Sequence, residues 1–336
     1  MPTLWKRPYS KRELLEHVGD VRQVGGLRRV RAVEGVEEGL EIVQVSTGEL
    51  EFEVLPSRGL DLGPARFRGR SLTWLSAAGF SHPGLSEEKG VLGWLRAFGG
   101  GLLTTCGLSN VGRPGVDQGV EYGQHGRASL TPAFEVAAWG EWQGEEYLLS
   151  VRGKTREAVL YGDRLEKTRT VRAWLGQNRL EVTDRVENLG AKPAALLLLY
   201  HVNLGWPLVQ AGTEVRAPST ALEVIEGTAE GWNALSGPDA GWRSAVLEHR
   251  MQPDTDGWVR IGVLGGGMRL ELAYEAASLP RFTQWRQLGS GDYVMGLEPG
   301  NVGVRGRAWE RANRTLPFLE PGESREFRLQ ISVESA

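Results

Sequence analysis

The sequence predicts an all-β fold, a large antiparallel β-sandwich with few short helices. Apolar and polar residues alternate with a period of two over much of the 336-residue chain, which is typical of strands with one buried face. The 46 glycines and 16 prolines separate these stretches at turn-like intervals. Because helical spacing is sparse, an antiparallel sandwich or barrel is favoured over alternating strands and helices.

The first predicted element is a short helix in the N-terminal stretch SKRELLEHVGD. Ser10 is suited to cap its start, Glu13 completes a capping box three residues later, and Gly19 ends it. We therefore expect residues 1–20 to form an N-terminal extension that includes this helix.

The strands that follow are recognised by their alternation. In GELEFEVL, the apolar residues Leu50, Phe52 and Val54 alternate with glutamates, as in a strand with one solvent-exposed face. The stretch TRTVRAWLGQNRLEVTD contains two such strands joined at Gly-Gln-Asn, which predicts a hairpin, and REFRLQISVE repeats the pattern near the C-terminus. Because no repeat, linker or charge block divides the chain, we predict one domain over residues 1–336.

The composition excludes several classes of function. A net charge of −3 and a pI near 6.1 provide no strong field for nucleic acid or an acidic membrane. No stretch approaches the roughly 20 apolar residues of a membrane span. Cys106 is the one cysteine, so no intramolecular disulfide can form, which fits a reducing compartment. We expect a cytoplasmic protein with no nucleic-acid or membrane partner, and the oligomeric state stays open.

A metal ion or cofactor is not expected either. The five histidines form no His-Xaa-His or His-Glu-Xaa-Xaa-His pattern. The stretch VRGKT ends like a phosphate-binding loop but lacks its first glycine. LGSGDYVMG lacks the third glycine of a dinucleotide-binding loop. We therefore expect the chemistry to depend on ordinary side chains.

Three ionisable residues lie in apolar or glycine-rich surroundings. His201 ends the run AALLLLYH, where a histidine is either a hydrogen-bonded structural group or a catalyst. His125 lies in YGQHGR, whose glycines either permit close approach of a ligand or form a tight turn. Glu298 follows an apolar strand, so it is either a partly desolvated base with a raised pKa or a strand-end carboxylate facing water.

Together these segments resemble the aldose 1-epimerase (galactose mutarotase) superfamily. VTDRVENLGAKPAALLLLYHVNLG resembles its strand, turn and second strand ending in the catalytic histidine, and QHG and GLEPGN resemble its two other motifs in the same order. The resemblance covers nearly the whole chain. It is closest to a less-studied bacterial branch, through LPSRGLDLGPARFRGRSLTW, GGGLLTTCGLSNVG and YHVNLGWP. It implies a galactose mutarotase-like supersandwich with an open groove and no metal or cofactor.

The resemblance also implies an isomerase that interconverts the α and β anomers of a sugar. Glu298 would be the base that removes the proton of the anomeric hydroxyl, and His201 the acid that protonates the ring oxygen. His125 would hydrogen-bond at the reacting end. The ring would open, the C1–C2 bond would rotate, and closure on the other face would reverse the two roles.

Five further residues are candidates for sugar binding. Arg96, in WLRAFGGG, resembles a substrate-contacting arginine of relatives; otherwise it is a surface arginine that covers apolar area. Asn203 follows the acid histidine by two residues, whereas the best-known members have His-Xaa-Xaa-Xaa-Asn, so sugar specificity does not transfer. Asp254, in PDTDG, is either a sugar contact or a turn residue. Trp206 and Trp285 are the candidates for stacking on a sugar face.

Two other functions stay open. A non-catalytic carbohydrate-binding protein would keep the arginine and the tryptophans but would not need a desolvated glutamate facing the histidine. A glycoside hydrolase or lyase would need two opposed carboxylates about 5 to 10 Å apart, and only Glu298 stands out. The substrate is identified only as a small-molecule sugar, which can be neutral, phosphorylated or oxidised.

Overall fold

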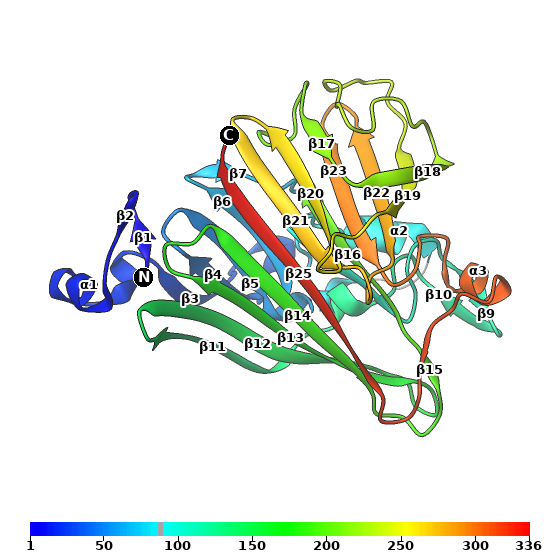
Figure 1. Ribbon diagram of the computed structural model, residues 1–336. Coiled ribbons are helices and arrows are strands. Elements are labelled where there is room, and N and C mark those ends of the chain that lie inside the picture. Colours follow the sequence, from blue (N-terminus) through cyan, green and yellow to red (C-terminus); the bar gives the residue numbers. More distant parts are fainter. Residues whose placement is uncertain (87–89) are drawn as a thin grey trace.

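The computed structural model describes residues 1–86 and 90–336, and its framework is three large antiparallel sheets (Figure 1). The largest sheet contains, in spatial order, β11 (Phe134–Gln143), β12 (Glu146–Ala158), β13 (Arg164–Trp174), β14 (Arg179–Asn188), β25 (Ser324–Ser335), β21 (Met268–Glu275), β20 (Trp258–Gly265) and β17 (Glu214–Arg216). The six-stranded sheet contains β18 (Ser219–Glu226), β19 (Ala245–Met251), β22 (Arg281–Leu288), β23 (Tyr293–Gly300), β16 (Leu197–Leu204) and β8 (Thr104–Leu108).

Smaller elements complete the fold. The five-stranded sheet contains β3 (Gly26–Arg31), β4 (Glu41–Ser46), β5 (Leu50–Leu55), β6 (Asp61–Phe67) and β7 (Arg70–Ser71). The two-stranded pairs are β1 (Thr3–Leu4) with β2 (Arg7–Pro8), β9 (Gly115–Asp117) with β10 (Val120–Tyr122), and β15 (Ala194–Ala195) with β24 (Phe318–Leu319). The α-helices are α1 (Lys11–His17), α2 (Gly90–Ala97) and α3 (Arg307–Ala312). No helix in the described part of the chain is long and apolar enough to span a membrane.

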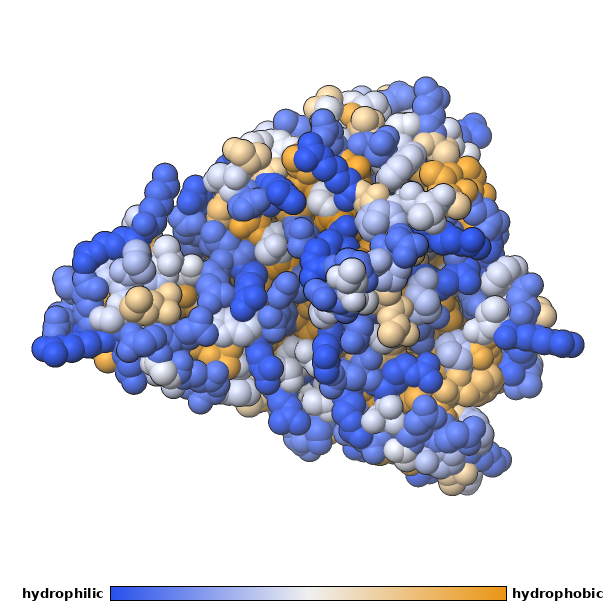
Figure 2. Space-filling view, in the orientation of Figure 1, coloured by the Kyte–Doolittle hydropathy of each residue, from blue (hydrophilic) through white to orange (hydrophobic). Residues whose placement is uncertain are grey.

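The main hydrophobic core joins residues of all three large sheets. Val182 of β14 and Leu329 of β25 contribute from the eight-stranded sheet, Phe52 of β5 from the five-stranded sheet, and Leu198 and Leu297 from the six-stranded sheet. Figure 2 shows mainly hydrophilic side chains on the face that the eight-stranded sheet turns outward. The period-two pattern therefore separates a buried face from a solvated face, and the predicted all-β sandwich is confirmed.

Predictions that rest on residues close together in sequence agree with the structure, except for the capping box at the start of α1. Ser10 caps α1 by accepting the backbone N–H of Glu13 at 3.1 Å. The Glu13 side chain pairs with Arg7 rather than completing the capping box. The predicted hairpin is formed by β13 and β14, with Ala173 opposite Leu180.

The leucine run forms β16, which is buried on both faces. Leu198, Tyr200 and Val202 belong to the main core. Leu197 and Leu199 belong instead to a second cluster, which also contains aromatic residues of the α2 region. Because side chains alternate along a strand, His201 lies on the side of this second cluster, and this face of the sheet carries the candidate site.

Candidate active site

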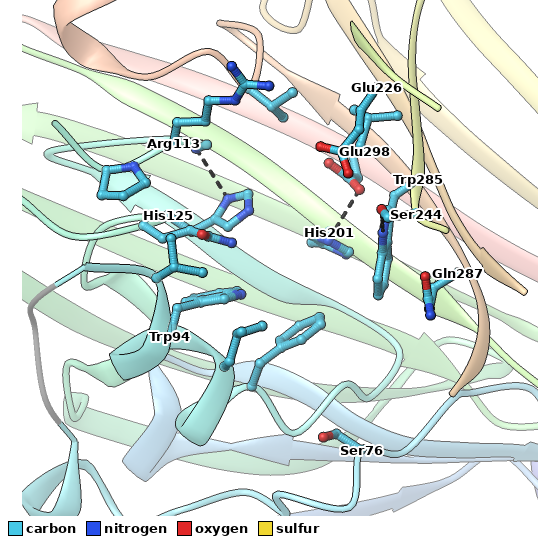
Figure 3. Close-up of a pocket in the computed structure, with 18 of the residues that line it drawn as sticks. Ser76, Trp94, Arg113, His125, His201, Glu226, Ser244, Trp285, Gln287 and Glu298 are labelled. Carbon is cyan, nitrogen blue, oxygen red and sulfur yellow. Dashed lines mark hydrogen bonds and ion pairs between the residues drawn. The ribbon is translucent and has the colours of Figure 1, made fainter. Parts of the chain in front are cut away.

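A pocket of about 910 Å³ opens on this face of the six-stranded sheet (Figure 3). His125, His201 and Glu298 all line it. The aromatic residues of its wall are Trp74, Trp94, Phe98 and Trp285, and its other polar residues include Arg113, Glu226, Ser244 and Gln287. The pocket thus joins the three ionisable residues that the sequence predicted, in mainly apolar surroundings.

Adjacent strands bring His201 and Glu298 together. Val202 of β16 is opposite Leu297 of β23, so His201 is opposite Glu298 on the pocket face. The Nε2 atom of His201 lies 3.2 Å from Oε1 of Glu298, and the two side chains are only 6% and 3% exposed. A Cβ at Gly296 would lie 2.8 Å from this carboxylate oxygen and 3.1 Å from Cε1 of the imidazole. Glycine at position 296 therefore leaves the space that the pair occupies.

Burial shifts the pKa values of both partners towards their uncharged forms. It raises the pKa of Glu298 to about 8. Burial lowers the pKa of His201 to about 3, with His125 adding to the lowering and Asn203 opposing it. At neutral pH the pair therefore holds one proton between two groups. One member can donate a proton while the other accepts one, as acid–base catalysis at two neighbouring atoms requires.

His125 supplies an uncharged donor beside the pair. The backbone N–H of Gly112 donates to its Nδ1 at 3.3 Å, so Nδ1 is an acceptor and the proton of the neutral ring is on Nε2. Burial lowers the pKa of His125 to about 4, which keeps the ring neutral at neutral pH. Its ring centre lies 5.9 Å from that of His201.

The local backbone explains why the residue after His125 is glycine. A Cβ at Gly126 would lie 2.5 Å from the carbonyl oxygen of Gly107 and 2.6 Å from that of Asn110. His125 itself has φ of 57°, in the left-handed region. The glycine therefore serves close approach of one backbone segment to another, rather than approach of a ligand.

Aromatic rings enclose both imidazoles. The ring centres of Phe98 and Trp285 lie 5.1 and 5.4 Å from that of His201, and that of Trp94 lies 4.8 Å from that of His125. The indole Nε1 of Trp285 donates to Oγ of Ser244 at 3.0 Å. These rings exclude water from the imidazoles, which accounts for the lowered pKa values.

Comparisons with other proteins add the family and the fold. Residues 37–333 match a family described as a domain of unknown function, DUF4432. The chain belongs to the DUF4432 family. A comparison with curated proteins gives no match.

Solved structures show how this DUF4432 protein relates to known folds. A Klebsiella pneumoniae protein named as a candidate aldose 1-epimerase has a TM-score of 0.86 at 23% identity, over 91% of this chain and 83% of that one. A galactose mutarotase-like protein from Clostridium acetobutylicum has a TM-score of 0.62 at 12% identity, over 94% and 100% of the chains. A galactose 1-epimerase from Lactobacillus acidophilus has a TM-score of 0.60 at 11% identity, over 93% and 99%. The mutarotase-like sandwich fold is therefore confirmed.

Three of the residues predicted to bind sugar lie away from the pocket of this DUF4432 protein. Arg96 is exposed on α2, and Trp206 is 70% exposed. Asp254 accepts two backbone N–H bonds within its own turn and pairs with Arg260. None of the three lines the pocket. The geometry thus favours Arg96 as a surface arginine and Asp254 as a turn residue, rather than either as a sugar contact.

The spacing on α2 explains why Arg96 points elsewhere. Trp94 lies on α2 and Phe98 directly follows its last residue, four positions later, and both line the pocket. Arg96 is between them in sequence and therefore on the opposite face. This aromatic spacing was the signal that sequence reasoning missed. Arg113 and Glu226 offered no comparable signal, because they come from segments far apart in the chain.

The two remaining predicted residues lie at the site in different ways. Trp285 lines the pocket, as expected of a residue that stacks on a ligand. Asn203 is fully buried two residues from His201 on β16. Its Nδ2 donates to the carbonyl oxygens of Gly101 and His201 at 3.1 and 2.9 Å. Among the residues that the structure describes, no group of three or more His, Cys, Asp or Glu is placed to hold a metal ion.

Proposed function

We propose that this protein is an aldose 1-epimerase that interconverts the anomers of a sugar by acid–base ring opening and closure. The observation that carries the proposal is the buried contact of 3.2 Å between Nε2 of His201 and Oε1 of Glu298 in an aromatic pocket. An acid and a base at neighbouring atoms can exchange one proton. The fold that the chain shares with mutarotase-like proteins is consistent with it.

In the proposed reaction, the ionised Glu298 takes the proton of the anomeric hydroxyl while the protonated His201 gives its Nε2 proton to the ring oxygen. The C1–O5 bond breaks and a carbonyl forms at C1. After rotation about the C1–C2 bond, the O5 hydroxyl attacks the other face of C1. Glu298 returns its proton to O1, and His201 takes the proton from O5. The pair holds one proton before and after each step, so no other acid or base is required.

His125 and Trp285 have supporting roles in this proposal. The Nε2–H of His125 would donate to an oxygen at the anomeric centre, where negative charge develops as the ring opens. A neutral, preorganised donor stabilises such charge without needing to reorganise. Trp285 would offer its face to the apolar side of the sugar.

The proposal is tested by measuring anomer exchange directly. Freshly dissolved α-glucose and α-galactose would be followed by polarimetry, and a panel of pentoses, deoxy sugars, uronates and sugar phosphates by NMR saturation exchange, all in the presence of EDTA. We expect acceleration for at least one class, with no effect of EDTA. Binding of a sugar with no acceleration would instead indicate a non-catalytic carbohydrate-binding protein.

Glycoside hydrolysis is a second candidate, because Glu226 lines the same pocket as Glu298. Hydrolysis would use the raised pKa of Glu298 for the general acid and Glu226 as the second carboxylate. Release of new reducing ends from a disaccharide, lost in Glu226→Gln, would favour it. Release of no new reducing ends from a disaccharide by the unaltered protein would exclude that role for Glu226.

A further inference from the structure

Two buried polar atoms on β16 have no hydrogen-bond partner among residues 1–86 and 90–336, which the structure describes. They are Nδ1 of His201 and Oδ1 of Asn203. The residues are two apart on one strand, so their side chains emerge on the same face. His201 is 5% exposed and Asn203 is 0% exposed, so bulk water does not reach the amide. An unpaired buried donor or acceptor is costly, and the cheapest remedy is for the two groups to pair.

The orientation of the Asn203 amide is determined by its other contacts. Its Nδ2 donates to the carbonyl oxygens of Gly101 and His201. A flipped amide would place Oδ1 against two acceptors, which cannot donate to it. The free oxygen of Asn203 can therefore only accept a hydrogen bond, and Nδ1 of His201 is a ring nitrogen that can donate one.

Building on the proposed function, we propose that Asn203 is a positioning residue whose Oδ1 accepts the Nδ1–H of His201 and so selects the tautomer with which His201 acts. The neutral ring then keeps its proton on Nδ1 and presents an unprotonated Nε2 to Glu298, 3.2 Å away. The protonated ring adds its second proton at Nε2, the nitrogen that faces Glu298. All proton transfer by His201 thus occurs at Nε2, the atom nearest the base.

The surroundings of His201 agree with this assignment. Burial and the neighbouring His125 lower its pKa, whereas Asn203 raises it, which is the effect of an acceptor on an imidazole N–H. The amide would thus keep His201 able to act as an acid in a site that otherwise disfavours the imidazolium. Asn203 does not line the pocket, so this role replaces the sugar contact that the sequence predicted.

The tautomer can be observed without any substrate. In the ¹⁵N-histidine-labelled protein at neutral pH, long-range ¹H–¹⁵N spectra separate protonated from unprotonated ring nitrogens, and His201→Gln identifies the signals of His201. We expect Nδ1 to be protonated. An unprotonated Nδ1 with a proton held only on Nε2 would overturn the proposal, whether or not the protein proves to be a mutarotase.

A kinetic experiment distinguishes a positioning role of Asn203 from a role in substrate binding. Asn203→Leu removes the acceptor, and we expect kcat to fall about 10- to 100-fold, as for other groups that orient a functional histidine, with KM nearly unchanged. The control is Thr104→Val, which removes the buried hydrogen bond to the Gly100 carbonyl opposite His201 but no acceptor for Nδ1. It should leave kcat and the tautomer unchanged. A rise in KM at constant kcat in Asn203→Leu would instead make Asn203 a substrate contact and contradict the proposal.

Discussion

Tyr200 and His201 are consecutive residues of β16, and their side chains enter opposite layers of the protein. The Tyr200 hydroxyl donates to Oδ2 of Asp184 at 2.8 Å, beside the buried ion pair that Asp184 forms with Arg169 between the sheets. His201 faces Glu298 in the pocket. Tyr200 therefore contributes to the packing between two layers, whereas His201 belongs to the proposed acid–base pair. Substitution of Tyr200 should mainly affect stability, and substitution of His201 should mainly affect activity.

Removing either member of the acid–base pair should slow catalysis without unfolding the protein. Glu298→Gln removes basicity and His201→Asn removes the proton donor, so each should lower kcat by about 10²–10⁴. Because the two groups act together, the double variant should lose much less than the product of the single losses. Thermal midpoint and kcat would be measured on the same samples. A lowered midpoint with normal turnover per folded molecule would mean that His201 serves the fold.

Tyr200→Phe should have the opposite effect. It removes a buried hydrogen bond to a charged group, which costs about 1–3 kcal/mol of unfolding free energy, but it leaves the pocket face of β16 unchanged. Urea unfolding and turnover would be compared with those of the wild type. A large loss of kcat at unchanged stability would show that the two faces of this strand are not independent.

The pH dependence of kcat/KM should reflect one shared proton. As the pH rises through about 8, the raised pKa of Glu298, the pair loses its proton and no acid remains, so activity should fall. On the acid side, a second proton adds only well below the ordinary histidine value of 6.5, because burial lowers the pKa of His201. Activity should therefore be level from weakly acidic to neutral pH. An acid limb centred at the ordinary histidine value would argue against a desolvated pair.

Gly296→Ala should disturb the pair directly. The added Cβ would lie 2.8 Å from Oε1 of Glu298, and the flexible carboxylate side chain would have to move away. A misplacement of this size should lower kcat by roughly 10- to 100-fold with a small effect on stability. Gly115→Ala is the matched control, since a Cβ at that position meets no atom of the described residues within 4 Å. Equal activity of the two variants would show that the carboxylate position is not critical.

Arg113 is expected to contribute more to sugar binding than Arg96. Arg113 lines the pocket and forms no ion pair with any residue in the described ranges, whereas Arg96 lies outside the pocket wall. Loss of a hydrogen bond from a charged group, roughly 1.5 kcal/mol at an exposed site, should raise KM about tenfold in Arg113→Ala. Arg96→Ala should leave KM unchanged. A larger rise of KM in Arg96→Ala than in Arg113→Ala would restore Arg96 as the substrate-contacting arginine.

The same Arg113→Ala variant tests for a phosphorylated substrate. A larger loss of binding for a sugar phosphate than for the neutral sugar would indicate one.

Two of the features predicted correctly from sequence depend on near neighbours alone. The capped start of α1 at Ser10 and the hairpin between β13 and β14 involve residues close together in the chain. Arg96 was proposed to bind sugar on a resemblance in WLRAFGGG, although its place on α2 opposite Trp94 and Phe98 turns it away from the pocket. Asp254 was open to two interpretations because a turn and a binding loop use the same residue types.

Sequence alone determined the alternation that puts Tyr200 and His201 on opposite faces, since the period of a strand is two whatever its surroundings. It also placed His201 and Glu298 at the ends of apolar runs, although in the structure both strands continue past them, to Leu204 and Gly300. Only the tertiary structure decided that these two strands pair in the register that brings the side chains to 3.2 Å. Their shifted pKa values likewise depend on the layers packed around them, because desolvation is a property of the assembled pocket and not of any one segment.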